Sequence, residues 1–122
     1  MYELSSSEFE ELICELFDKK GYNVKLTQKT RDGGKDILVV ENNFLGNFLI
    51  YVECKKHRPD RPIGVDLIRQ FYGVISMDNA TAGLLITTSY FTKDAVKLNE
   101  PFRHRISLVD YTKLVEAIQI VK

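Results

Sequence analysis

Residues 36–55 constrain the fold of this chain more than any other segment. Two runs rich in β-branched and aromatic side chains, 36–40 and 48–55, flank a connection at 41–47 that contains asparagines and a glycine. This pattern predicts two antiparallel strands of a hairpin, joined by a loose turn. A hairpin places the start of its first strand beside the end of its second strand, so residues from those two ends should meet.

Three charged residues fall at that meeting point. Glu53 and Lys55 should share one face of their strand, and cross-strand pairing should bring Asp36 close to them. Two carboxylates and the backbone carbonyl of Cys54 would suit a divalent cation, and a nearby lysine can hold an attacking water. A surface ion-pair ladder would also explain Glu53 and Lys55, so the residues alone leave both interpretations open.

Length, charge and cysteine content limit the alternatives. The 122 residues predict one domain over residues 1–122, and 17 basic side chains balance 17 acidic ones. Nucleic-acid binding therefore cannot be inferred from net charge and would need a local basic patch. Cys14 and Cys54 lack metal-ligand spacing and are expected to be reduced thiols. Without a long apolar run or a signal-peptide pattern, we expect a cytoplasmic protein that does not enter the membrane.

The first helix has two candidate N-caps. Ser7 with Glu10 forms one possible capping box, and Ser5 with Glu8 forms a competing one.

Hydrophobic periodicity in the rest of the chain predicts an alternation of helices and strands. The order α-β-β-β-α-β-α-β-α, opening with antiparallel strands, favours a mixed sheet with helices on both faces. Helices are expected at about 8–20, 65–77, 93–99 and 111–121, and further strands at 22–28, 82–87 and 106–110.

Several short motifs follow one another along nearly the whole chain: Phe9-Glu10, Gly21-Tyr22, Asp32-Gly33-Gly34-Lys35-Asp36, Val52-Glu53-Cys54-Lys55-Lys56, Ile68-Arg69-Gln70-Phe71-Tyr72-Gly73, Ile86-Thr87-Thr88-Ser89-Tyr90-Phe91 and Ala95. In this order they resemble the catalytic domain of the Mrr family, which groups with the PD-(D/E)XK nucleases. The resemblance implies an α/β, restriction-endonuclease-like fold, with a central mixed β-sheet and an αβββαβ core flanked by helices.

The resemblance also implies roles for single residues. Asp36 and Glu53 would bind Mg²⁺, or Mn²⁺ in its place, and Lys55 would be the catalytic lysine. Mrr-like domains often carry glutamine where this chain has Glu53, so the motif here returns to the general superfamily form. Glu10 matches the family's helix glutamate and would reach the metal directly or through water, with Glu11 as a weaker candidate.

A cluster of basic residues follows the predicted strand that carries Glu53 and Lys55. Its side chains are expected to contact phosphates of double-stranded DNA, although a solvated loop is the plain alternative. The candidates are Lys56, His57, Arg58, Arg61 and Arg69, together with Arg31 and Lys35 across the site and Gln70 on the following helix.

These observations predict a metal-dependent DNA endonuclease. Two alternatives stay open: a non-catalytic DNA-binding or assembly module with the same fold, and a junction or repair nuclease. A homodimer would supply the two cuts of a double-strand break. Modified-base specificity would need a separate recognition domain or subunit.

Overall fold

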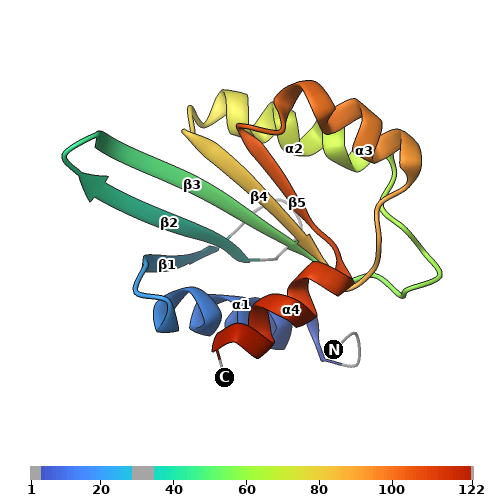
Figure 1. The fold of residues 1–122 in the computed structure, drawn as a ribbon, viewed down its shortest axis with the longest axis horizontal. Helices are drawn as coiled ribbons and strands as arrows, with labels where there is room; N and C mark the ends of the chain where they lie inside the picture. The colour runs from blue at the N-terminus through green and yellow to red at the C-terminus, as the bar shows by residue number, and fades with distance from the viewer. Residues whose placement is uncertain (1–3, 29–34, 122) are drawn as a thin grey trace.

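The computed structural model describes residues 4–28 and 35–121, without the side chains of residues 26–28, 35–36 and 120–121. The chain forms one five-stranded sheet with helices on both sides (Figure 1). The helices are α1 (Ser6–Lys19), α2 (Val65–Met77), α3 (Lys93–Asn99) and α4 (Tyr111–Val121), with a short 3₁₀ turn η1 (Glu100–Phe102). The strands are β1 (Asn23–Gln28), β2 (Lys35–Asn43), β3 (Gly46–Lys55), β4 (Ala82–Thr87) and β5 (Ile106–Val109).

The sheet is mixed, as the sequence predicted. Its strands follow the order β1-β2-β3-β4-β5. The first three strands pair antiparallel, whereas β3, β4 and β5 run parallel because α2 and α3 return the chain to the same end. β3 is thus the strand at which the antiparallel half of the sheet meets the parallel half.

Each face of the sheet has its own hydrophobic core. Alternate side chains of the central strands point to opposite faces, so neighbouring residues such as Tyr51 and Val52 enter different clusters. α1 and α4 cover one face with a cluster of Phe9, Ile13, Ile37, Val39, Val52, Ile86 and Leu114. α2 and α3 cover the other with a cluster of Tyr51, Ile63, Ile68, Phe71, Ile75, Ala80, Leu85, Ala95 and Ile106.

Gly83 lets α2 lie close to β4. A Cβ atom at this position would lie 2.7 Å from Cδ1 of Ile75 and 2.9 Å from the ring of Phe71. A side chain at this position would displace Ile75 and Phe71, so glycine allows the close approach. The helix that follows β3 is therefore seated tightly against the sheet.

Two details of the hairpin region differ from the sequence prediction. The turn is tight rather than loose, because β2 and β3 continue to the pair Asn43 and Gly46 and leave only two residues between them. Gly46 has a φ of 138°, a conformation that favours glycine. Tyr22 lies just before β1 and packs edge-on against the ring of Phe17, 5.7 Å away, instead of opening the strand.

The C-terminal predictions need one smaller correction. β5 ends at Val109, and Asp110 instead caps α4, because its Oδ1 accepts a hydrogen bond from the backbone N–H of Lys113 at 3.0 Å. None of the helices in the described part of the chain has the length and apolar character needed to cross a membrane.

Candidate active site

The start of β2 and the end of β3 lie at the same end of the sheet. Their ladder reaches the pair Ile37 and Val52, so Asp36 and Glu53 are the next residues along the two strands. The register thus brings the two predicted metal-binding positions together at the level of the backbone. The side chain of Asp36 lies outside the described residues.

Glu53 and Lys55 lie on the face of the sheet that α2 covers. The residue between them, Cys54, packs against the cluster beneath α1, whereas Tyr51 belongs to the cluster beneath α2. Because side chains alternate along a strand, Glu53 and Lys55 project with Tyr51. Both are half-buried, which is unlike a fully solvated ion-pair ladder.

The carbonyl of Cys54 is directed toward β2. The next carbonyl, that of Lys55, accepts a hydrogen bond from the backbone N–H of Thr88 at 3.3 Å and so points to the β4 side. Successive carbonyls along a strand point to opposite sides, so the carbonyl of Cys54 faces the strand that carries Asp36. This direction is the one that the predicted ligand role requires.

The N-cap of α1 shows that Glu10 does not form the capping box with Ser7. Ser5 is the cap: its Oγ accepts from the N–H of Glu8 at 3.1 Å, and Oε1 of Glu8 accepts from the N–H of Ser5 at 2.8 Å. The backbone hydrogen bond from Ser5, and then its hydroxyl, hold the pKa of Glu8 below its usual value. The predicted box between Ser7 and Glu10 is therefore wrong, because the alternative register satisfies the helix end.

Glu10 is a buried carboxylate, with 8% of its surface exposed. Its neighbour Phe9 packs in the same cluster as Ile37 and Val52, the last pair of the β2–β3 ladder. The pKa of Cys14 is raised mainly by burial and secondarily by the negative charge of Glu10. The first turns of α1 therefore lie beneath the end of the sheet that carries the candidate site, as Figure 1 also shows.

Residues 56–64 form a basic connector between β3 and α2, and its cations are exposed to solvent. Lys56, Arg58 and Arg61 are exposed, and His57 is half-buried. The N–H of Arg61 donates to the carbonyl of Arg58 at 2.8 Å, which closes a turn. Arg58 also pairs with Asp60 at 3.3 Å, so part of its charge is already balanced.

The remaining predicted DNA contacts are more scattered. Arg69 and Gln70 are exposed on α2, and Arg69 pairs with Asp66 at 3.6 Å and lines a groove between α2 and α3. None of the predicted catalytic residues with a described side chain lines that groove. Arg31 and the side chain of Lys35 lie outside the described residues.

Sequence reasoning missed the role of Thr88 and Ser89. Both side chains are buried, and their hydroxyls bond to the backbone of the basic connector. The available signal was a run of hydroxyl residues, 87–89, directly after an apolar strand. Such residues need hydrogen-bond partners when they are buried.

The donor atoms predicted for the metal site are all oxygens. Asp36, Glu53 and Glu10 offer carboxylates and Cys54 offers a carbonyl, a set of hard ligands that suits Mg²⁺ or Mn²⁺ better than softer metals. Among the described side chains, no three His, Cys, Asp or Glu residues already gather at ligand distance. Asp36, whose side chain is not among them, is the residue on which such a cluster would depend.

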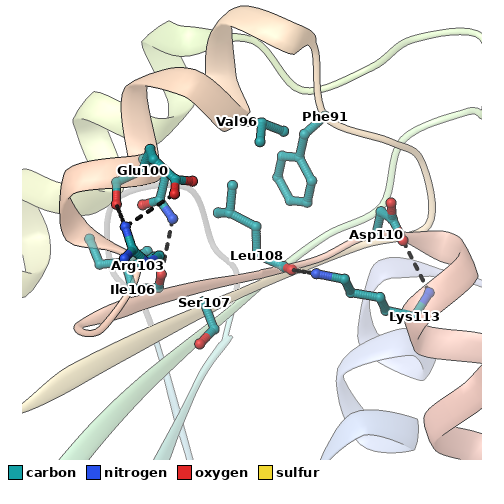
Figure 2. A pocket seen from close by; sticks show the side chains of 10 residues that line it. Phe91, Val96, Glu100, Arg103, Ile106, Ser107, Leu108, Asp110 and Lys113 are labelled. Atoms are coloured by element: carbon teal, nitrogen blue, oxygen red, sulfur yellow. Dashed lines mark hydrogen bonds and ion pairs between the residues drawn. The ribbon is translucent and has the colours of Figure 1, made fainter.

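Another surface pocket lies away from the candidate site. It has a volume of about 290 Å³ and is lined by residues of α3, η1, β5 and the start of α4 (Figure 2). Its charged groups are bonded within the chain: Arg103 pairs with Glu100 at 3.1 Å, and Nζ of Lys113 reaches the carbonyl of Leu108 at 3.5 Å. Because none of the described candidates Glu10, Glu53 and Lys55 lines it, this pocket is not the candidate active site.

Residues 1–118 match the model of the Mrr-type restriction endonuclease catalytic domain. The chain belongs to this restriction endonuclease family. It is 29% identical over 120 residues to the type IV methyl-directed restriction enzyme EcoKMrr of Escherichia coli K12, an alignment that covers 94% of this chain and 38% of that protein. The family and the fold predicted from the sequence are both confirmed.

Two solved restriction endonucleases share the fold. The modification-dependent enzyme AspBHI superposes with a TM-score of 0.78 at 21% identity, over 98% of this chain and 32% of that one. MspJI, solved with a 27-mer oligonucleotide, gives 0.69 at 15% identity, over 97% of this chain and 28% of that one. This chain thus spans only about a third of the length of these relatives.

Proposed function

We propose that this domain is a divalent-metal-dependent endonuclease that hydrolyses phosphodiester bonds in double-stranded DNA. The observation that carries the proposal is the register of β2 and β3. Their ladder stops at Ile37 and Val52, which leaves Asp36 and Glu53 as neighbours, with Lys55 two residues further on. The family supports an endonuclease, and the hard oxygen donors support Mg²⁺, with Mn²⁺ as a substitute.

The residues would divide the work as follows. Asp36, Glu53 and the carbonyl of Cys54 would hold the metal, which when bound neutralises charge on the phosphate and favours deprotonation of a water. Glu10 comes from α1, on the face opposite Glu53, so it would contribute past the strand ends and through water. Lys55, on the face of Glu53, would orient the attacking water and stabilise the charge that develops in the transition state.

DNA binding is assigned to the connector after β3. Lys56, Arg58 and Arg61 are exposed within a few residues of Lys55, so they would contact phosphates on either side of the scissile bond. His57 is half-buried and held by its backbone, which favours a role in the shape of the loop over a role as a base.

The small size of the domain supports two further proposals, on its dimerisation and on the recognition of modified bases. A domain with one site makes one cut, so two copies would pair for a double-strand break. Sedimentation with and without DNA would test this, and a monomer under both conditions would leave a nicking activity. Recognition of modified bases would lie in a separate domain or subunit, since the domain matches only 38% of EcoKMrr.

Cleavage of supercoiled plasmid tests the proposal. Nicked or linear product should form with Mg²⁺ or Mn²⁺ and disappear with a chelator. Asp36→Asn should abolish cutting and weaken Mn²⁺ binding in calorimetry, because it removes an anionic ligand without changing shape. Asp78→Asn, at the exposed C-cap of α2, is the matched control and should leave both unchanged.

DNA binding without any metal-dependent cutting would favour the non-catalytic module. Cutting of branched junctions in preference to linear duplexes would favour the junction or repair nuclease.

A further inference from the structure

The connector between β3 and α2 is fastened to the segment that follows β4. At its start, the N–H of Thr88 donates to the carbonyl of Lys55 at 3.3 Å. At its end, the N–H of Ile63 donates to the carbonyl of Tyr90 at 2.7 Å, and the N–H of Thr92 donates to the carbonyl of Ile63 at 2.9 Å. These backbone hydrogen bonds fix both ends of the connector. Residues 57–61, in its middle, are held by side-chain hydroxyls instead.

The hydroxyl of Thr88 holds the backbone of His57. Its Oγ1 accepts from the N–H of His57 at 3.0 Å and donates to the carbonyl of the same residue at 2.6 Å. Both backbone groups of His57 thus find their partner in one side chain, as they would in a neighbouring strand. Thr88 is 1% exposed, so water does not readily replace it.

The hydroxyl of Ser89 holds the backbone of Pro59 and Arg61. Its Oγ lies 3.1 Å from the carbonyl of Arg61 and 3.4 Å from that of Pro59, and the residue is fully buried. The N–H of Ser89 is itself held by Oγ1 of Thr87 at 3.0 Å. Two consecutive residues of the β4 end therefore determine where the backbone of residues 57–61 runs.

The connector carries cations on this fixed backbone. The side chains of Lys56, Arg58 and Arg61 are exposed, while the atoms that bind Thr88 and Ser89 belong to the main chain. A loop that is already ordered loses less conformational freedom when it binds a ligand. The hydroxyls thus act on DNA binding through the positions of these charges, without touching DNA themselves.

We propose that Thr88 and Ser89 are positioning residues that hold the basic connector ready for the phosphates of DNA. The inference rests on the proposed function for the nature of the ligand. The hydrogen bonds themselves can be tested without DNA.

The test compares three variants in the full chain. Thr88→Val keeps the shape of the side chain and removes its hydroxyl, and Thr88→Ser keeps the hydroxyl. Thr81→Val is the matched control, because Oγ1 of Thr81 accepts from the N–H of Leu49 at 2.9 Å and so joins the same two strands at their other end. Equilibrium unfolding checks that all three variants remain folded.

The first measurement is amide hydrogen exchange of His57. Thr88→Val should speed exchange at this amide by about tenfold, since its acceptor is lost, and Thr88→Ser should restore protection. Thr81→Val should leave this amide unchanged. Unchanged exchange at His57 in Thr88→Val would overturn the proposal, whether or not the protein cuts DNA.

The second measurement is DNA affinity as a function of salt. Thr88→Val should weaken binding by about three- to tenfold and flatten the salt dependence by about one unit of slope. The rate at saturating DNA should fall far less than the affinity, and Thr88→Ser should bind like the wild type. Faster exchange with unchanged affinity and slope would show that the hydroxyl serves stability alone, and would overturn the positioning role. A wild-type protein that binds DNA without cutting it would contradict the catalytic part of the proposed function and leave this comparison of affinities intact.

Discussion

The two ends of β3 are built in different ways. At its start, a two-residue turn joins it to β2: Oδ1 of Asn43 accepts from the N–H of Leu45 at 2.8 Å, and Gly46 takes a positive φ. The turn is wholly local, and Phe44 at its tip is 97% exposed. At its other end, the chain continues as a connector held by residues about thirty positions further along.

This difference indicates that the two ends of β3 contribute to different properties of the protein. A local turn keeps its shape without help from the core, so its side chains are free to vary. The connector end depends on distant buried hydroxyls, and it holds Glu53, Lys55 and the exposed cations. Changes at the connector end should therefore affect activity, and changes at the turn should affect stability or nothing.

The largest effect is expected at Lys55. Lys55→Ala should lower the single-turnover cleavage rate by about a hundredfold or more, since its charge is needed mainly in the transition state. DNA affinity should stay nearly unchanged. Lys25→Ala, an exposed strand lysine on β1, is the control and should cut at the wild-type rate. A parallel loss of affinity and rate in Lys55→Ala would move this residue from catalysis to binding.

The next effect is expected in the connector. Replacing Lys56 and Arg58 with alanine should weaken DNA binding by about tenfold or more and flatten its salt dependence by roughly one unit of slope per lost contact. Removing two exposed lysines, Lys19 and Lys20, at the far end of α1 makes the same change in net charge. If both double variants lose the same affinity, only general electrostatic attraction is at work and the connector has no special role.

A smaller effect is expected at the turn. Gly46→Ala should destabilise the fold by about 1–2 kcal/mol, because alanine is strained at a φ of 138° although no atom lies within 4 Å of the added Cβ. Gly73→Ala, in the exposed interior of α2 with equal room, should instead stabilise by about 1 kcal/mol. Chemical denaturation measures both, and equal effects would refute the role of φ at Gly46.

The smallest effect is expected at the tip. Phe44→Ser should change the unfolding free energy by less than about 0.5 kcal/mol and leave cleavage unchanged, since 97% of this residue is already exposed to solvent. Sedimentation of this variant tests whether the turn takes part in self-association. A loss of self-association would show that the turn end of β3 has a function of its own in assembly.

Most of the local structure could be predicted from the amino-acid sequence. The bounds of α2, β4 and α4 agree with the predicted 65–77, 82–87 and 111–121, and Thr92 caps α3 as expected. These features depend on residues within about four positions of one another, where periodicity and capping chemistry are visible directly. The charged motif at 36–55 likewise predicted that the ends of β2 and β3 meet.

Tertiary contacts were needed to choose between alternatives that the local sequence made equivalent. Ser5 and Ser7 offered the same capping chemistry, and the fold selected Ser5 and buried Glu10. The hydroxyls of Thr88 and Ser89 find backbone partners about thirty residues earlier, through the parallel pairing of β3 with β4. Such contacts depend on strand register and helix packing, which are set by the burial of whole faces and not by neighbouring residues in the sequence.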